Sequence, residues 1–253
     1  MILRINPLSW GVRSVLIVIG LRTLSLTLVL VAASLLVIFF LLPRPPTLSA
    51  PVTHVSTTSK LVALTFDDGP DPRYTPQILA TLARNQAQAT FFLLGSMVDK
   101  YPQLAQRIVA QGNEVANHGF RHLNCRNCSS TVTRQDIESA QAAIQQATGV
   151  KPTLFRYPYG KYNASSLRAV EQAGLTPIQW TVDSFDWRRP PPGTIANRVL
   201  SQVKPGSIVL LHDGGGSNRA NTVAALELIL PVLKKEGYRM VTVSRMLQMS
   251  QGG

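Results

Sequence analysis

Cysteine and charged side chains are both scarce in this chain. Its 253 residues include two cysteines, and charged residues make up 15% of the total, whereas about a quarter is usual for soluble domains. With 45% apolar residues a chain of this length can bury a full core without metal or disulfide cross-links. No internal repeat is visible, and no block of Lys and Arg is interleaved with aromatic residues, which argues against nucleic acid as a partner.

The low charge content has a local cause near the N-terminus. Residues 24–42 contain no charge and are long enough to cross a bilayer core of roughly 30 Å as a helix. Three arginines precede this run and only Arg44 follows it closely, so we expect a single-pass signal anchor with residues 1–23 in the cytoplasm and the rest exported. A cleaved signal peptide is the alternative, but its apolar core is usually shorter, at about 7–15 residues. A buried core helix fits poorly with the flanking Arg22.

The sequence after the apolar run is predicted to contain a linker, one domain and a short tail. Residues 43–60 are rich in Pro, Ser and Thr, which is typical of an extended, solvated linker. The exported part keeps a net charge of +8 once the four arginines up to Arg44 are subtracted from +12. Such a charge favours attraction to an anionic surface or polymer outside the cell. We expect the domain over 61–247 and the tail over 248–253.

Short apolar runs alternate with amphipathic stretches from Leu61 onward. This alternation predicts parallel strands joined by helices, and therefore an α/β domain built as a barrel or an open sheet. The strand-like runs are 61–66, 89–95, 113–118, 153–157, 176–182, 207–212 and 238–243, and the helix-like stretches are 75–84, 102–111, 133–147, 164–173, 194–203 and 220–236. Gly112, Gly149, Gly174 and Gly237 follow four of the helix-like stretches, where a helix end favours glycine.

Polar side chains recur at the ends of the predicted strands. Asp67 and Asp68 follow the first strand, His118 ends the third, and His212 ends the sixth. Functional sites in α/β folds gather at the carboxyl ends of parallel strands. We therefore expect these side chains to converge, although an Asx turn in TFDDGP and a structural histidine in LLHD remain alternatives when each is considered alone.

The stretch HGFRHLNCRNC, residues 118–128, contains two histidines and two cysteines. All four are good zinc ligands, so the stretch is either one closed structural metal site or two separate features. His118 and His122 are four residues apart, which on a helical turn would bring both rings to one face. The spacing is tighter than in zinc fingers, whose two ligand pairs are separated by about a dozen residues.

Five short motifs together resemble those of the polysaccharide deacetylase family, the NodB-homology carbohydrate esterases. They are TFDDGP, HGFRH, RYPYG, DSFDW and LLHD, in that order, over about residues 60–245. The resemblance implies a distorted (β/α) barrel with about seven strands and one divalent metal. That metal is commonly zinc, with Co²⁺, Ni²⁺ or Mn²⁺ as alternatives.

The resemblance also implies a role for each motif residue. Asp68, His118 and His122 would bind the metal. Asp67 would be the general base, held by Arg156, and His212 would be the general acid, oriented by Asp183. The backbone N–H of Tyr159 would stabilise the oxyanion, while Trp187 and Leu210 would line the pocket for the acetyl group and sugar.

This assignment separates the histidines from the cysteines. A closed Cys₂His₂ site would leave Asp68 without a metal and leave no open position for water. In an exported domain we expect Cys125 and Cys128 to form a disulfide, with a reduced pair or a thiol-redox motif as alternatives. The family usually has Ser or Thr after the first histidine, where this chain has Gly119, so we expect a looser loop there.

The predicted function is metal-dependent removal of N-acetyl groups from N-acetylglucosamine residues of an extracytoplasmic polysaccharide. Peptidoglycan is the first candidate substrate, followed by chitin-like oligosaccharides, an exopolysaccharide and O-acetyl xylan. A catalytically silent sugar-binding relative and a thiol-redox module are the functions to be distinguished from it. We expect a monomer attached to the membrane through residues 24–42.

Overall fold

The computed structural model describes residues 50–216 and 218–250. The predicted cytoplasmic segment and the predicted anchor over 24–42 therefore lie outside the described residues. Within the described part, none of the helices is long and apolar enough to cross a bilayer.

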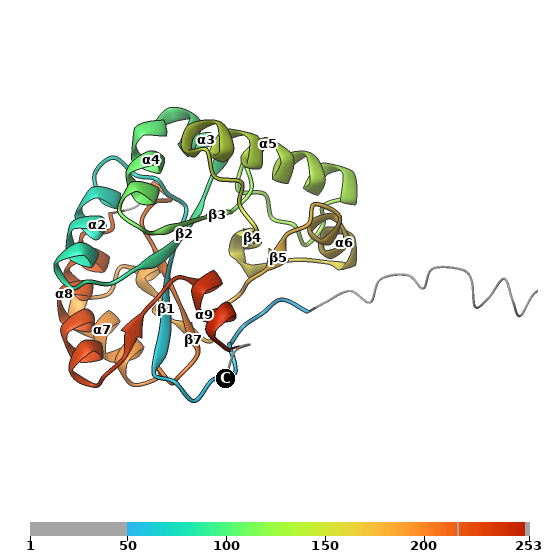
Figure 1. Cartoon of the computed structure of the whole chain (residues 1–253). Coiled ribbons are helices and arrows are strands. Elements are labelled where there is room, and N and C mark those ends of the chain that lie inside the picture. The colour runs from blue at the N-terminus through green and yellow to red at the C-terminus, as the bar shows by residue number, and fades with distance from the viewer. Residues whose placement is uncertain (1–49, 217, 251–253) are drawn as a thin grey trace, which may run out of the picture. The chain divides into compact units, whose positions relative to one another are not determined.

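The core of the described domain is one sheet of parallel strands (Figure 1). Seven strands follow each other in the order β5-β4-β3-β2-β1-β7-β6, and β8 pairs with β1 beside this path. Their bounds are β1 Leu61–Asp67, β2 Ala89–Leu93, β3 Glu114–Asn117, β4 Leu154–Phe155, β5 Thr176–Pro177, β6 Val182–Asp183, β7 Ser207–His212 and β8 Arg239–Met240. All pairs among these strands are parallel, which matches the α/β, distorted-barrel expectation for this part of the chain.

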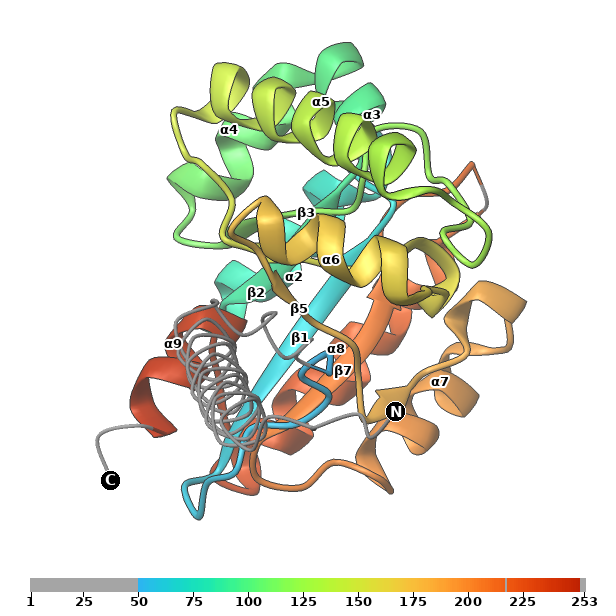
Figure 2. The ribbon, with the colours of Figure 1, turned by 90° about the vertical axis from the view of Figure 1, so that its right-hand side faces the viewer.

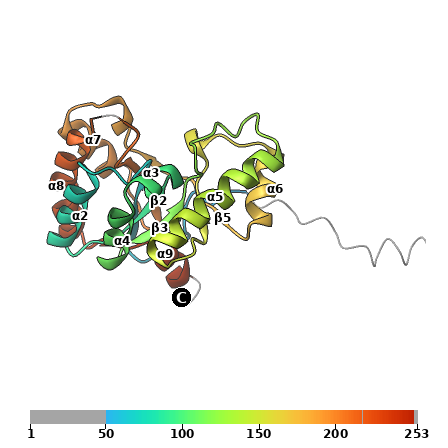
Figure 3. The ribbon, with the colours of Figure 1, turned by 90° about the horizontal axis from the view of Figure 1, so that it is seen from above.

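Helices cover the outer side of the curved sheet in two groups (Figures 1 and 3). Helices α2, α7 and α8 pack together on one side, and α3, α4, α5 and α6 on the other. Their bounds are α2 Thr75–Arg84, α3 Gly95–Lys100, α4 Pro102–Ala110, α5 Ser130–Thr148, α6 Ala164–Gln172, α7 Pro192–Leu200 and α8 Ala220–Lys235. Two short 3₁₀ turns, η1 Pro158–Gly160 and η2 Asp186–Arg188, lie in the loops after β4 and β6.

The last helix, α9 Val243–Ser250, lies at the amino ends of the strands (Figure 2). The backbone N–H of Val243 donates to Thr90 Oγ1 at the start of β2. Ser244 donates to the carboxylate of Glu114 at the start of β3. The predicted tail over 248–253 therefore begins inside a helix, and the predicted strand over 238–243 is reduced to β8 by the turn into α9.

Strand β1 shows how the sequence builds two cores and a site. Successive side chains on a strand face opposite sides of the sheet. Leu61 and Ala63 belong to the cluster inside the barrel, whereas Val62, Leu64 and Phe66 pack against the outer helices. The inward series continues through Thr65 to Asp67, so the strand delivers one carboxylate to the carboxyl-end opening of the barrel.

The N-terminal segment of the described chain is packed, contrary to the predicted solvated linker. We call residues 51–55 the strap. The Val52 N–H donates to the Pro177 carbonyl at 2.8 Å, and the Val55 N–H donates to the Gly206 carbonyl at 3.0 Å. Val55 is 3% exposed and joins the barrel interior. Two valines within a Pro- and Thr-rich stretch are enough to fix it against the strands, so the domain begins before residue 61.

The structure contains all six predicted helices, but it differs from the prediction in its shortest elements. Each of the six predicted helix-like stretches overlaps a helix, and the four glycines all have positive φ. Gly149 is the left-handed C-cap of α5 with φ 74°. The predicted strand over 176–182 is divided into β5 and β6, and α3 was not predicted.

Candidate active site

A cavity of about 400 Å³ lies at the carboxyl ends of the strands. Nine of the ten side chains predicted for catalysis, metal binding and substrate contact line it: Asp67, Asp68, His118, His122, Tyr159, Asp183, Trp187, Leu210 and His212. The tenth, Arg156, is fully buried directly behind Asp67. Residues separated by up to 145 positions in the sequence therefore meet in one pocket.

The two adjacent aspartates point in different directions, as expected for an extended backbone. Asp67 is the last residue of β1, and its Oδ1 accepts a hydrogen bond from Arg156 Nη1 at 2.7 Å. Asp68 follows with φ 74°, a left-handed conformation that aspartate tolerates better than most residues. This turn directs the Asp68 carboxylate to the histidines.

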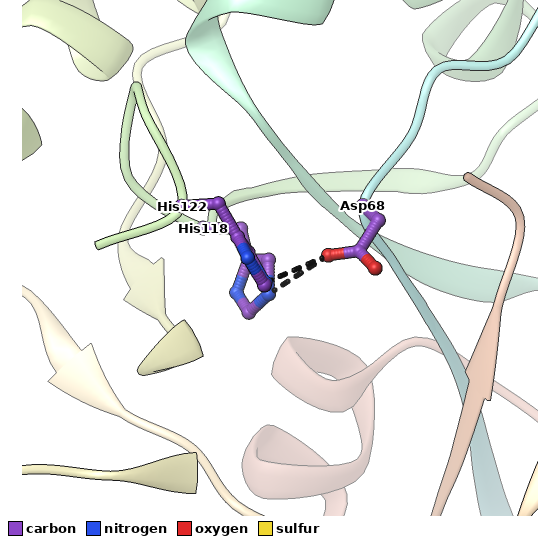
Figure 4. Close-up of side chains that lie close together, drawn as sticks. All are labelled: Asp68, His118 and His122. Carbon is purple, nitrogen blue, oxygen red and sulfur yellow. Dashed lines mark ion pairs between the residues drawn. The ribbon is translucent and has the colours of Figure 1, made fainter. Parts of the chain in front are cut away.

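Asp68, His118 and His122 form a compact group (Figure 4). Asp68 Oδ1 lies 3.4 Å from His118 Nε2 and 3.1 Å from His122 Nε2. Potential ligand atoms of the three side chains all lie within 4.8 Å of one another. The expected helical turn is absent: both histidines lie in the loop after β3, where Gly119 has φ 79° and His122 has φ 59°.

The donor set fits a divalent metal of the zinc type. Two imidazoles and one carboxylate are the ligands of many catalytic zinc sites, which keep a further position open. Asp68 Oδ1 is buried and has no hydrogen-bond donor within the described chain. Burial by itself raises the pKa of Asp68, but contacts with His118 and His122 hold that pKa well below its usual value, so the carboxylate is ionised.

A backbone carbonyl on the side away from Asp68 fixes the orientation of the His118 ring. Its Nδ1 lies 2.9 Å from the Arg156 carbonyl oxygen, which can only accept a hydrogen bond. With the proton on Nδ1, the lone pair of Nε2 is directed at the Asp68 side of the cavity. Such a backbone contact behind a ligand is the usual way in which proteins set the tautomer of a metal-binding histidine.

Arg156 holds Asp67 in place. Its guanidinium is 0% exposed and donates to Asp67 Oδ1, to Thr65 Oγ1 at 2.7 Å and to the Gln179 carbonyl at 3.1 Å. The guanidinium carbon lies 4.0 Å from the centre of the Phe92 ring. A buried charge is stable only when it is paired and hydrogen-bonded. Each of the two buried charges, on Arg156 and on Asp67, is therefore stabilised by the other.

The carboxylate that meets His212 is Asp186, not Asp183. Asp186 Oδ1 lies 2.7 Å from His212 Nδ1, and Asp186 Oδ2 accepts the His212 N–H at 2.9 Å. The Thr222 hydroxyl also donates to Oδ2, at 2.8 Å. Burial lowers the pKa of His212, but the Asp186 carboxylate more than offsets this and raises it to about 8.

Asp183 has a different role in the structure. It ends β6, and its Oδ1 accepts the Phe185 N–H at 2.8 Å. Burial raises the pKa of Asp183, against the effect of that hydrogen bond. The motif DSFDW contains two acids three residues apart, and the sequence offered no signal to choose between them. The turn at Phe185, with φ 53°, is what carries the second acid under His212.

The predicted substrate-contacting residues form the walls of the cavity. Leu210 is 4% exposed, whereas Tyr159 and Trp187 are 61% and 44% exposed. Tyr159 has φ 60°, and its ring centre lies 4.4 Å from that of His122. Trp180, Lys161 and Arg219 also line the cavity and were not predicted, because none of them stands in a motif.

The loop that carries the two histidines is held by Asp136 of α5. Asp136 is 5% exposed and accepts N–H groups from Phe120 at 2.8 Å and from Arg121 at 3.2 Å. A Cβ added at Gly119 would lie 2.5 Å from Asp136 Oδ2. The glycine therefore leaves room for this carboxylate, and the expected looser loop is not what the structure contains.

The predicted disulfide is not formed. Cys125 and Cys128 are free thiols, and their sulfurs approach the carbonyl oxygens of Leu123 and Asn124 at 3.5 and 3.4 Å. Burial, with a contribution from Cys128, raises the pKa of Cys125 to about 12, so this thiol is not a reactive thiolate. Neither cysteine lines the cavity. Neither belongs to the cluster of Asp68, His118 and His122.

Comparison with known proteins agrees with this geometry. The family model for polysaccharide deacetylases matches residues 54–178. A peptidoglycan-N-acetylglucosamine deacetylase of Bacillus cereus is 42% identical over 197 residues, which cover 77% of this chain and 92% of the relative. The chain belongs to the polysaccharide deacetylase family. The resemblance read from the five motifs is thereby confirmed.

Other members of the family are similar over most of the same region. A chitooligosaccharide deacetylase of Sinorhizobium fredii is 40% identical, covering 74% of this chain and 92% of that protein. The crystal structure of the Bc1960 peptidoglycan N-acetylglucosamine deacetylase has a TM-score of 0.76 and 36% identity over 79% of this chain and 93% of its own. A CE4 family pseudoenzyme from Bacillus anthracis has a TM-score of 0.73 and 32% identity, over 78% of this chain and 69% of that one.

Proposed function

We propose that this protein removes N-acetyl groups from N-acetylglucosamine residues of an extracytoplasmic polysaccharide, with peptidoglycan as the first candidate. The observation that carries the proposal is that Asp67, His212 and the proposed metal ligands line one cavity. Those ligands are Asp68, His118 and His122. The relatives named as peptidoglycan and chitooligosaccharide deacetylases support the same chemistry.

Asp68, His118 and His122 would hold one divalent metal, with zinc the first candidate and Co²⁺, Ni²⁺ or Mn²⁺ as alternatives. Such an ion, when bound with an open position, lowers the pKa of water and polarises a carbonyl oxygen. This chemistry suits an acetamide, whose carbonyl is a poor electrophile. The Asp68 carboxylate and the two imidazoles would serve as its ligands and would exchange no proton.

Asp67 acts as the general base. The hydrogen bond from Arg156 leaves Oδ2 free to accept a proton, and this oxygen lies 3.7 Å from His118 Nε2, next to the proposed metal ligands. A base must reach the proton that it removes, and Asp67 is the carboxylate that lines the cavity beside these ligands without belonging to their set.

His212 acts as the general acid. With a pKa of about 8 its imidazolium is populated at neutral pH, and Asp186 on Nδ1 leaves the Nε2 proton available for the departing amine. The backbone N–H of Tyr159 would donate to the developing oxyanion. Trp187 and Leu210 would confine the acetyl group and the sugar.

We further propose that residues 24–42 form a single-pass signal anchor, with residues 1–23 in the cytoplasm and the catalytic domain outside the cell membrane. The support is the uncharged run of nineteen residues and the arginines that precede it. Mass spectrometry of the mature chain tests this: a chain that begins after Leu42 would contradict an uncleaved anchor.

A catalytically silent sugar-binding protein is the second candidate, because one of the similar structures is a family pseudoenzyme. Acetate release decides between the two. The purified full chain is incubated with peptidoglycan, chitin oligomers and acetylated xylan, with and without a chelator, and with zinc restored. We expect release that the chelator abolishes and zinc restores, and no release by Asp67→Asn. Binding of these glycans without acetate release under all conditions would favour the silent relative.

A further inference from the structure

Two cationic side chains, Lys161 and Arg188, stack on exposed aromatic rings that line the cavity. Lys161 Nζ lies 6.0 Å from the centre of the Tyr159 ring. The Arg188 guanidinium lies 4.6 Å from the Trp187 ring and 5.0 Å from the Phe185 ring. Lys161 itself lines the cavity, as do Tyr159 and Trp187. Stacking on a ring restricts a long side chain, so the charge of Lys161 stays at the cavity and that of Arg188 stays beside the Trp187 wall.

Neither cation is neutralised by an acid of the described chain. Among the described residues, the ion pairs include no acid opposite Lys161 or Arg188. Among the acids of the cavity, Asp67 is paired with Arg156, Asp68 lies beside the two histidines, and Asp183 accepts the Phe185 N–H. The exposed charges of Lys161 and Arg188 therefore have no acidic partner in the described part of the chain.

A third cation lies deeper in the same cavity. Arg219 lines it and is 4% exposed. Its Nε donates to the Gly214 carbonyl at 2.8 Å, whereas its Nη1 is buried and has no hydrogen-bond acceptor within the described chain. A buried guanidinium nitrogen without an acceptor is costly. Its charge helps to keep Asp186 ionised.

The rim cations are presented by strained backbone. Tyr159, next but one to Lys161, has φ 60°, and Phe185 and Arg189 on either side of Trp187 and Arg188 have φ 53° and 59°. None of these residues is glycine, so each of these backbone conformations is strained. These conformations lower the stability of the folded domain, and they orient the loops after β4 and β6 toward the cavity. Backbone strain of this kind is typical of binding sites.

We propose that Lys161 and Arg188 form a subsite for carboxylate groups of the glycan. The substrate class is then an acidic polymer of acetamido sugars that carries carboxylates beside the reacting sugar, rather than a neutral polymer such as chitin or xylan. The identity of the reacting acetamide rests on the proposed function. The carboxylates can belong to the sugars themselves or to attached peptides, and the cations recognise the same group in both.

The test compares soluble glycans that differ only in carboxylates. Three substrates are used: peptide-free glycan strands that keep their lactyl carboxylates, the same strands after conversion of those carboxylates to methylamides, and fragments that still carry peptides. Acetate release by the full chain gives KM and kcat for each. A preference already present in the peptide-free strands identifies a sugar carboxylate, whereas one that appears only with peptides identifies peptide carboxylates.

The variant Lys161→Gln with Arg188→Gln should raise KM for the carboxylated glycan about tenfold and leave kcat within about twofold, because exposed charge pairs are individually weak. KM for the methylamide glycan should not change. Salt should weaken wild-type binding of the acidic glycan more than binding by the variant.

The matched control is Lys100→Gln with Arg245→Gln, which removes the same charge elsewhere. Lys100 also stacks on a tyrosine, Tyr101, at 5.2 Å, and neither residue lines the cavity. The control should behave as wild type. An equal loss on neutral and acidic glycans, no loss on either, or the same loss in the control would overturn the subsite. If no glycan releases acetate, the proposed function fails, and equilibrium binding of the same three glycans still tests the subsite.

Discussion

The orientation of His212 depends on a single carboxylate that the motif pattern does not distinguish from its neighbour. Asp186 contacts both the ring and the backbone of His212, and is itself 1% exposed. Asp183, three residues earlier, accepts a hydrogen bond from its own loop instead. The residue types of the site could be read from the sequence, but the turn between these two acids could not.

Asp186→Asn should shift the alkaline limb of the pH–activity profile. His212 is protonated below its pKa of about 8 and loses the proton above it, so activity that needs the acid is present at neutral pH and falls as the pH rises through 8. Without the Asp186 charge the pKa moves toward the ordinary value of 6.5. The limb should therefore move by about one pH unit to lower pH, with activity at pH 8 falling about fivefold.

Asp183→Asn is the control for this prediction. It removes a carboxylate from the same loop and the same cavity without touching His212, so the limb should stay near pH 8. kcat/KM measured from pH 6 to pH 10 in the three proteins gives the answer. A shift in the Asp183 variant with none in the Asp186 variant would contradict the assignment.

At the scale of elements, the loop after β3 and helix α5 act together. Asp136 on α5 accepts two backbone N–H groups of the loop that carries His118 and His122. Its carboxylate occupies the space beside Gly119, a position that a side chain on residue 119 would need. The sequence shows that residue 119 is glycine where the family usually has Ser or Thr. The residue that fills the space, Asp136, lies 17 positions away, and only the fold brings the two together.

Gly119→Ala should lower the free energy of unfolding by about 2–4 kcal/mol, through its positive φ and the contact with Asp136. For a domain of this size we expect the thermal midpoint to fall by roughly 5–15 °C. Gly149→Ala is the matched control, since Gly149 also has a positive φ, 74°, but its added Cβ would meet no atom within 4 Å. The control should cost only about 1 kcal/mol. Equal midpoints for the two variants would mean that Asp136 exerts no steric constraint.

Long periodic elements were predictable and short ones were not. The helices α5 and α8 and the strands β1 and β7 carry enough residues for an apolar period to be read. Helix α3 has six residues, and β5 and β6 have two each, so their pattern is too short. The ends of these short elements are decided by contacts between distant segments.

At the scale of the whole molecule, the strap joins the edge strand β5 to β7, the neighbour of the other edge strand β6. Residues 51–55 bond to the segment after β5 through Val52, and to the start of β7 through Val55. The composition of 43–60 indicates a solvated linker, whereas the burial of Val55 and the partial burial of Val52 are tertiary effects that composition does not report.

Val55→Asp should destabilise the domain by about 3 kcal/mol or more, because it places an unpaired charge in the barrel interior. Ser56→Asp introduces the same charge on an exposed neighbour and should change stability by less than about 0.5 kcal/mol. Urea unfolding of both variants measures the difference. Equal midpoints would mean that the strap does not contribute to the folded domain.

We propose that Asp68, His118 and His122 bind one catalytic metal, to which Cys125 and Cys128 do not contribute. Metal content of the full chain, measured after dialysis against trace zinc, tests this most directly in Asp68→Ala and in Cys125→Ser with Cys128→Ser. We expect the aspartate variant to lose the metal and the double cysteine variant to keep one equivalent, since neither sulfur approaches the group. Zinc lost from the cysteine variant and retained by Asp68→Ala would contradict the account.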